Sequence, residues 1–166
     1  RQTYKCFSCG EGGDVISFLM KMEGLSYPET IRHLAAKYHI EIEEVEMTDR
    51  ERADAAEREA QLAALEASQL FFENELKDGS NTAAISYLEG RGISRKTLTE
   101  FGAGYAPGQN KLIHDLRGRI GMSRLRSVGV VKEGEHGNYD TFRERITFPF
   151  YSVSGKVIGF TGRLLD

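Results

Sequence analysis

The stretch YDTFRERITFPF, residues 139–150, decides the fold of the region around it. Polar and apolar side chains alternate along it, as they do on a strand with one buried face. The alternation predicts one face with Arg143, Arg145 and Thr147. Glu144, Ile146 and Phe148 are predicted on the other. Pro149 cannot donate a ladder hydrogen bond, which indicates an edge strand or a bulge.

The next residues, YSVSGKVIGFTGR at 151–163, complete a predicted β-hairpin. Ser152–Gly155 has the composition of a turn, and Gly155 can adopt a positive φ. The return strand then brings Arg163 close to Arg145, within one residue of register. Arginines gathered on a rigid sheet face suit a polyanion, although solvated arginines on a half-buried hairpin explain the same pattern.

The net charge of −3 conceals two oppositely charged blocks. Residues 41–78 contain 13 Asp and Glu against 4 Lys and Arg, whereas residues 91–132 contain 9 Lys and Arg against two acids. Opposite blocks favour separate roles, and the basic block is the one able to contact phosphates. A solvated charged face is the alternative for either block. The arginines that could extend a phosphate surface are Arg117, Arg119, Arg124 and Arg126.

Composition and length narrow the class of protein. No apolar run approaches the roughly 18 residues of a membrane span and no signal peptide opens the chain, so we expect no membrane contact. The chain begins at Arg1 and stops at Asp166 just after an apolar strand, so we expect a fragment of a longer protein. The two cysteines, Cys6 and Cys9, are too close in sequence to staple a secreted fold, which predicts a cytoplasmic protein.

Cys6 and Cys9 have the spacing of a zinc knuckle. Two thiolates in Cys-x-x-Cys can reach one ion, and Gly10 permits the tight turn behind the second sulfur. A closed structural zinc site needs four ligands, and His33 and His39 lack the paired spacing that would supply the other two. The sequence therefore predicts half of a zinc site, with two free thiols as the alternative.

The rest of the chain predicts an α+β fold. Asp14, Ser26 and Thr48 have the pattern of helix N-caps. The third opens one long helix or two in series over 49–77, which is Ala/Glu/Arg-rich at first and richer in Leu and Phe later, and a domain boundary is expected within 43–60. Shorter elements are predicted after it: helices over 82–89, 95–101, 109–118 and 123–127, N-caps at Ser94 and Ser123, an extended stretch over 103–107, a strand over 128–132 and a loop over 134–138.

Several motifs, in order along the chain, now resemble one family. YKCFSCGEGGDVISFLMK at 4–21 resembles the second half of the zinc-binding domain of bacterial replicative (DnaG-type) DNA primases. RGIS at 91–94, followed by FGAGYAP at 101–107, is similar to the opening of their RNA polymerase core. FRERITFP at 142–149 with GKVIGFTGR at 155–163 is similar to their basic signature hairpin.

The resemblance implies three parts. Residues 1–43 would be the C-terminal half of a zinc ribbon, 44–68 an acidic helical linker, and 69–166 the N-terminal subdomain of the polymerase core. The remaining zinc ligands, a Cys and a His in the family, would precede this chain, so Cys6 and Cys9 would be its own metal ligands. The catalytic Toprim part, whose carboxylates bind magnesium or manganese, would follow, so no catalytic residue is expected within the chain.

The resemblance also implies a function and partners. The family synthesises short RNA primers on a single-stranded DNA template from ribonucleoside triphosphates. It works with the replicative helicase, for which no binding region is expected in this chain. Arg143, Arg145 and Arg163 fall on basic positions that would contact template or nucleotide phosphates, and Lys156 completes the predicted binding set. A guanidinium fork suits that task because it can donate to two oxygens at once.

Two positions depart from the family pattern. Thr141 stands where the family usually has Arg, and Thr161 where it usually has Gly, which indicates a divergent primase. Tyr105 and Tyr139 could stack a base, with half-buried packing residues as the alternative.

Two other functions fit the same sequence. A zinc-ribbon and basic module could hold single-stranded DNA without chemistry, and would lack the downstream Glu and Asp-x-Asp carboxylates. An interaction protein could use the acidic helix of residues 49–60 as its contact surface, and its DNA affinity would not depend on Arg143 and Arg145.

Overall fold

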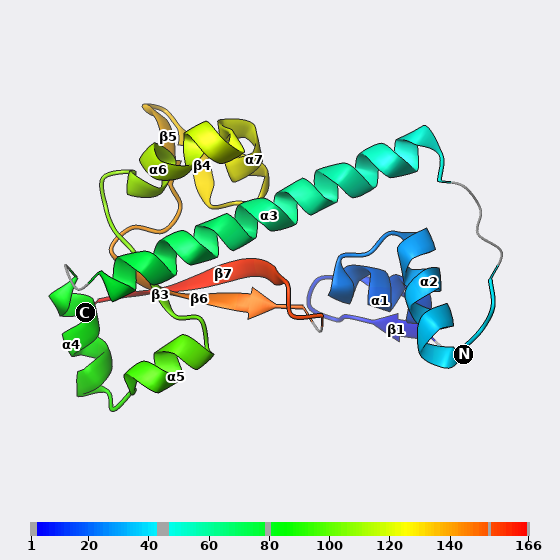
Figure 1. Ribbon diagram of the computed structural model, residues 1–166, viewed down its shortest axis with the longest axis horizontal. Coiled ribbons are helices and arrows are strands. Elements are labelled where there is room, and N and C mark those ends of the chain that lie inside the picture. The colour runs from blue at the N-terminus through cyan, green and yellow to red at the C-terminus, as the bar shows by residue number, and fades with distance from the viewer. Residues whose placement is uncertain (1–2, 43–46, 79–80, 153, 166) are drawn as a thin grey trace. The chain divides into compact units, whose positions relative to one another are not determined.

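The computed structural model describes residues 3–42, 47–78, 81–152 and 154–165. The chain folds into two compact units, Arg1–Glu57 with Ser152–Gly155, and Arg58–Tyr151 with Lys156–Asp166. Figure 1 shows helices beside short antiparallel strands in each. In the described ranges, no helix combines the length and the apolar character that crossing a membrane requires.

The first unit opens on a small antiparallel hairpin that leads into a helix. Strands β1 (Thr3–Lys5) and β2 (Gly12–Asp14) pair with each other. Helix α1 (Val15–Glu23) follows at once, because the Asp14 carboxylate accepts a hydrogen bond from the Ser17 amide at 2.7 Å and satisfies one of the free amides of the first turn. The N-cap predicted at Asp14 is confirmed.

The next two helices begin with capping boxes, as the sequence predicts. In α2 (Tyr27–Tyr38), the Glu29 carboxylate accepts from the Ser26 amide at 2.7 Å. Thr48 starts α3 (Asp49–Lys77) in the same way. The long helical stretch is therefore a single helix. Its first turns are charged and largely exposed, whereas its later part buries Ala64, Leu65, Phe71, Phe72 and Leu76.

The second unit is built on a three-stranded antiparallel sheet of order β3-β6-β7. Its strands are β3 (Gly104–Ala106), β6 (Arg145–Tyr151) and β7 (Val157–Leu164). The predicted hairpin is confirmed in β6 and β7, and the Gly155 amide closes the turn by donating to the Ser152 carbonyl at 2.9 Å. Because β3 pairs with β6 only as far as Thr147, Pro149 lies where β6 has a free edge, next to the bulge at Phe150 and Tyr151.

Two helices and a second hairpin cover one face of this sheet (Figure 1). They are α6 (Lys111–Ile120), α7 (Met122–Ser127), β4 (Val131–Gly134) and β5 (Gly137–Asp140). Phe72 of α3 joins them and meets Phe142 and Phe160 edge to face, with ring centroids 6.2 and 5.3 Å away.

The opposite face is covered by α4 (Thr82–Gly90) and α5 (Arg95–Glu100). The Ser94 hydroxyl caps α5 by accepting from the Thr97 amide at 3.1 Å, as predicted. Ile146, which is 1 % exposed, lies at the centre of this second core. The α+β class is confirmed, with the sheet sandwiched between two helical layers.

Three local expectations were wrong. α7 starts at Met122, so Ser123 lies inside the helix and does not cap it. Residues 134–138 are not a loop, because β4 (Val131–Gly134) pairs with β5 (Gly137–Asp140). Only the two residues between Gly134 and Gly137 form the turn. Tyr139 and Asp140 consequently belong to β5, and the basic hairpin begins only at Arg145.

Candidate nucleic-acid interface

The candidate site is the segment from Tyr139 to Arg145, which links β5 to β6. Tyr139 is held in the β4–β5 ladder opposite Lys132, and Arg145 is held in the sheet opposite Ala106 and Leu164. Between these two ends, Asp140 and Thr141 form hydrogen bonds, Phe142 packs in the core and Arg143 lies on an aromatic ring. The segment is therefore a rigid support for its two arginines.

Asp140 is the deepest anchor of the segment, at 2 % exposure. Its carboxylate accepts hydrogen bonds from the amides of Leu112 at 3.1 Å and Ile113 at 3.2 Å, in the first turn of α6. Its own amide donates to the Asn110 side-chain oxygen at 3.0 Å. Burial raises the pKa of Asp140, while the two amides and the more distant charges of His114 and Arg143 oppose that rise.

Thr141 and Phe142 continue the anchoring. The Thr141 hydroxyl donates to the Gly129 carbonyl at 2.7 Å, and its amide donates to the Val130 carbonyl at 2.9 Å. Phe142 packs into the aromatic cluster against α3. The residue that departs from the family pattern at 141 thus has a structural contact of its own.

Arg143 lies on the ring of Tyr139, with the guanidinium carbon 4.9 Å from the ring centroid. Its side chain is exposed. The ring face predicted as a possible base platform is therefore occupied by this guanidinium. The next residue, Glu144, has φ of +51°, a left-handed conformation that turns the chain between the two arginines.

Arg145 and Arg163 lie at the same end of the sheet but on opposite faces. Arg163 is paired with Ile146, and directly paired residues share a face, whereas Arg145 alternates with Ile146. The half-buried Arg145 side chain crosses Gly162, where an added Cβ would lie 3.1 Å from its Cδ. The expectation of one shared cationic face is thus corrected: the register divides the arginines between the two faces.

Lys156 lies at the other end of the hairpin. It precedes β7 beside Tyr151, six residues along β6 from Arg145, which corresponds to about 20 Å of strand. The structure therefore brings Arg143 and Arg145 together on one segment, adds Arg163 at the same sheet end, and separates Lys156 from them.

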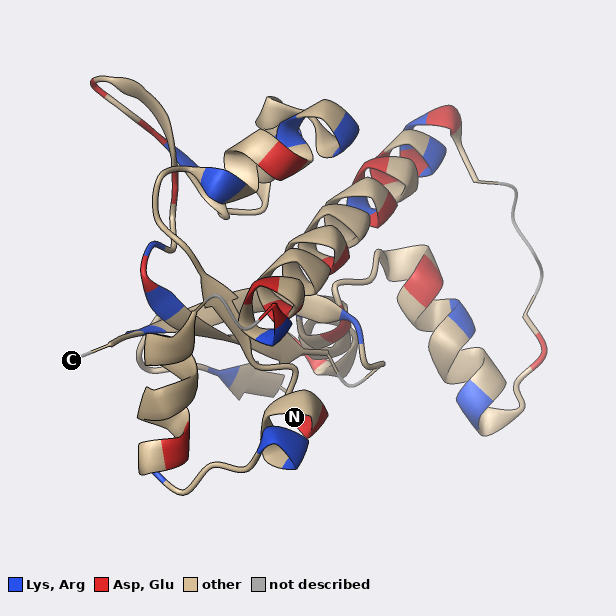
Figure 2. Cartoon of the chain, turned by 60° about the vertical axis from the view of Figure 1, so that its left-hand side comes forward, with Lys and Arg blue, Asp and Glu red and all other residues tan. Residues whose placement is uncertain are grey.

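The basic block at 91–132 does not form one surface. Arg91 stacks on Tyr87 at 4.7 Å, Arg95 pairs with Glu89 at 3.7 Å, Lys111 pairs with Glu75 at 2.6 Å, and Arg126 pairs with Glu133. Figure 2 shows the Lys and Arg positions of this region spread over several elements. Much of its positive charge is paired with acidic or aromatic side chains of the same chain. The charge counted from the sequence is therefore larger than the charge left for a ligand.

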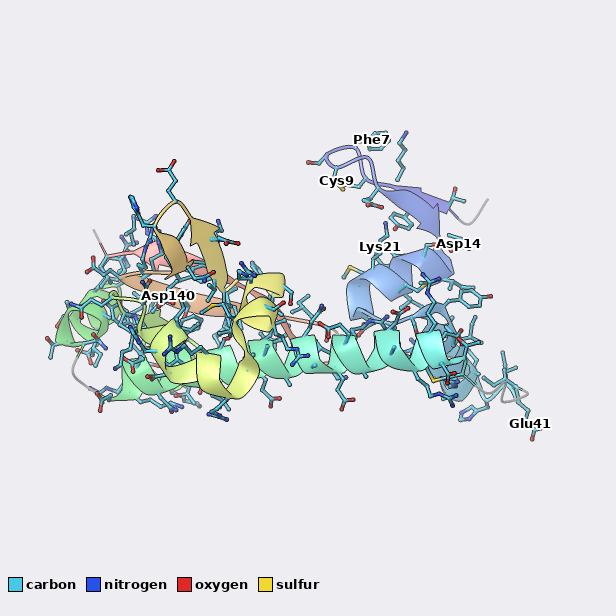
Figure 3. The ribbon with its side chains drawn as sticks, turned by 90° about the horizontal axis from the view of Figure 1, so that it is seen from above. Phe7, Cys9, Asp14, Lys21, Glu41 and Asp140 are labelled. Carbon is cyan, nitrogen blue, oxygen red and sulfur yellow. The ribbon has the colours of Figure 1, made fainter. Side chains whose placement is uncertain are left out.

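Cys6 and Cys9 lie at the tip of the β1–β2 hairpin, near the exposed Phe7 (Figure 3). The tip is a tight turn in which the Gly10 amide donates to the Cys6 carbonyl at 3.0 Å and Gly10 has φ of +77°. The amides of Cys9 and Ser8, together with the Cys9 thiol, lower the pKa of Cys6.

This knuckle fits half of a zinc site. A lowered thiol pKa favours the thiolate, which is the form that binds zinc. Across the described ranges, no three His, Cys, Asp or Glu side chains are grouped so that they could hold a metal ion. Neither His33 nor His39 belongs to such a group in those ranges.

Sequence reasoning missed Asn110 and Asp140. The signal for Asp140 was an acid three residues before Arg143, and an exposed acid there would look the same in sequence. Their pairing depends on two segments 30 residues apart meeting in space.

Two family models match the chain. The model described as "DNA primase catalytic core, N-terminal domain" matches residues 71–166, and the model described as "CHC2 zinc finger" matches residues 1–50. The second match supports zinc binding by the Cys-x-x-Cys hairpin.

Named relatives and solved structures agree with these models. The DNA primase of Clostridium acetobutylicum is 38% identical over 100% of this chain, and that of Escherichia coli K12 is 32% identical over 99%. The chain spans 28% and 29% of those two proteins. A DnaG primase catalytic domain bound to ssDNA matches with a TM-score of 0.63 and 31% identity, covering 68% of this chain and 37% of that one.

The Aquifex aeolicus primase, solved as its zinc-binding and RNA polymerase domains, matches 99% of this chain and 39% of its own, with a TM-score of 0.60 and 29% identity. The catalytic-core model covers more than half of this chain, and the residues it covers include the basic hairpin and the segment that presents its arginines. The chain therefore belongs to the DnaG-type family of bacterial DNA primases.

Proposed function

We propose that this chain is part of a primase that synthesises RNA primers on single-stranded DNA, and that Arg143 and Arg145 bind template or nucleotide phosphates. The observation that carries the proposal is the anchored segment between β5 and β6. It presents two arginines that form no ion pair with any described residue. Guanidinium groups held in place lose little entropy when they bind phosphate oxygens.

Arg163 and Lys156 have smaller parts in the proposal. Arg163 is exposed at the same sheet end, so it could meet a strand that passes around that end. Lys156, about 20 Å along the hairpin, would meet only a more distant stretch of the same ligand.

Cys6 and Cys9 would hold a structural zinc ion together with two ligands from outside this chain. Bound zinc would tie the hairpin tip to the segment that supplies those ligands. The proposed division is a zinc-ribbon part over 1–43, a helical linker over 44–68 and a core part over 69–166.

The remaining components are proposed from the family. Metal-binding carboxylates for magnesium or manganese would lie in the Toprim part outside this chain, so no catalytic residue is assigned within it. Ribonucleoside triphosphates would be the substrates, the replicative helicase a partner, and the cytoplasm the location.

The test is a salt titration of single-strand binding. With a fluorescein-labelled oligothymidylate as the probe, the double variant Arg143→Ala, Arg145→Ala should weaken binding. It should also flatten the slope of log affinity against log salt by about 0.7 for each lost phosphate contact. Arg50→Ala with Arg52→Ala is the matched control, because it removes the same charge from exposed positions on α3.

An unchanged slope in the first variant would contradict the proposal. Equal flattening in both variants would also contradict it, because it would show that only total charge matters. Affinity unaffected by either change would favour the interaction protein with an acidic contact helix.

A further inference from the structure

The segment that presents Arg143 meets a second unusual loop. Three residues other than glycine adopt left-handed backbone conformations here: Gln109 with φ of +61°, Asn110 with +56° and Glu144 with +51°. Cβ-bearing residues rarely adopt this conformation, and where several do, the surrounding contacts must hold them. The two loops touch, because an added Cβ at Gly108 would lie 3.5 Å from the Glu144 carboxylate.

Asn110 and Asp140 join these loops by reciprocal hydrogen bonds. The Asn110 side-chain oxygen accepts from the Asp140 amide at 3.0 Å. In return, the Asp140 carboxylate accepts from Leu112 and Ile113, the residues just after Asn110. Each loop therefore holds the other, and both are buried from water at Asp140.

Capping the first turn of α6 does not by itself require the hydrogen bonds between Asn110 and Asp140. Asn110 occupies the N-cap position of α6, and asparagine is among the best capping residues, yet its side chain does not cap the helix. It turns to Asp140 instead, and the cap comes from a residue 28 positions from Leu112 along the chain. A local cap would serve folding equally well but would leave the segment at 139–145 untied.

Two interactions connect the Asn110–Asp140 hydrogen bonds to Arg143. Tyr139, the neighbour of Asp140, supplies the ring on which the guanidinium lies 4.9 Å away. The buried Asp140 charge also interacts favourably with the Arg143 charge. Displacement of Asp140 would therefore move both the ring and the backbone that set the direction of the guanidinium.

We propose that the Asn110–Asp140 pair is a positioning element that aims Arg143 at a nucleic-acid phosphate. The inference rests on the proposed phosphate binding by Arg143 and adds residues that no basic motif would indicate. Neither Asn110 nor Asp140 touches the ligand in this scheme.

The experiment compares Asp140→Asn, Arg143→Ala and the double variant in the full 166-residue chain, with the labelled oligothymidylate as the probe. Asp140→Asn retains the size of the side chain but loses its charge and one acceptor. It should flatten the salt slope by about 0.7, the same as Arg143→Ala. The double variant should show no further flattening, because both changes remove one contact.

A substitution in the core distinguishes loss of Arg143 positioning from a general loss of stability. Leu125→Ala removes a side chain that is 0 % exposed and lies in the core beneath the same face. It should lower the denaturant midpoint while leaving the salt slope unchanged. If Asp140→Asn does not fold, Asn110→Gly gives the readout: glycine tolerates the left-handed backbone, and the change removes the side chain whose oxygen holds Asp140.

The two proposals fail in different ways. If Arg143→Ala flattens the slope but Asp140→Asn and Asn110→Gly do not, positioning is overturned and phosphate binding stands. If Arg143→Ala leaves the slope unchanged, phosphate binding by this residue is overturned, and positioning with it. Additive flattening in the double variant would also overturn positioning.

Discussion

At the residue scale, close packing explains why the motif Phe101–Pro107 has glycine at positions 102 and 104. Gly102 has φ of +61°, and an added Cβ would lie 2.4 Å from the Tyr151 hydroxyl. At Gly104 an added Cβ would lie 2.5 to 2.8 Å from Cβ, C and O of Phe72. Helix α3 thus passes over β3 at a distance that only glycine allows, which fixes the helix against the sheet bearing the arginines.

Gly104→Ala should therefore destabilise the second unit. Two of the three atoms it meets belong to the Phe72 backbone, so the helix itself must shift, at a cost of about 1–3 kcal/mol or more. Urea unfolding would measure the change in the free energy of unfolding.

Gly118→Ala is the matched control. Gly118 is exposed in α6, and an added Cβ there meets nothing within 4 Å. Alanine should stabilise by about 0.5–1 kcal/mol because it loses less backbone entropy than glycine in a helix. Equal destabilisation by both substitutions would show that close packing at Gly104 is not the cause.

At the element scale, hydrogen bonds between residues close together in the chain determine where the helices begin. Asp14 and Thr48 each accept from a free amide of the first turn three residues on, and at the start of α2 the Glu29 carboxylate accepts from the Ser26 amide, so these effects are visible in a sequence window. The Thr48–Glu51 box is the start of α3, whose first turns have few tertiary contacts to support them. The hydrogen bonds from the Thr48 amide and hydroxyl lower the pKa of Glu51, with a smaller effect from Arg32.

This pKa shift predicts a pH-dependent start of α3. A depressed carboxyl pKa in the folded state stabilises the turn above the unfolded pKa of about 4.3, and the effect is lost as the pH falls through the lower folded value. The helical ¹³Cα shifts of residues 49–52 should decline over that range. Glu51→Gln keeps the shape without the titration, so the same decline in that variant would contradict the assignment.

At the scale of the whole molecule, the chain corresponds to only part of the length of its relatives. It spans 28% and 29% of two primases that it matches along nearly its entire length. In the proposed zinc site, Cys6 and Cys9 are two of the four ligands that a closed site requires. If the site forms as proposed, bound zinc would add to the stability of the first unit.

The isolated chain should accordingly purify with less than one equivalent of zinc. Two thiolates alone leave half of the coordination to water or to other molecules. Elemental analysis would measure the zinc content, with Cys6→Ser, Cys9→Ser as the control that removes both ligands. A full equivalent held by a monomer would show that the chain itself supplies two further zinc ligands.

The sequence by itself determined features whose causes are local or periodic. These are the α+β class, the helix starts at Asp14, Ser26 and Thr48, the turn at Ser152–Gly155 and the Cys6–Cys9 knuckle. Each depends on residues close together in the chain, so a window of sequence contains its whole physical cause.

Only the tertiary structure decided which cations lie on the same face of the sheet. Strand register, with its period of two, placed Arg163 on the face opposite Arg145, and a one-residue difference would have reversed that outcome. The β4–β5 pairing took Tyr139 and Asp140 out of the basic hairpin. It also brought the Asp140 amide to the Asn110 side-chain oxygen and the buried Asp140 carboxylate to the amides of Leu112 and Ile113, and a buried carboxylate needs such hydrogen-bond donors.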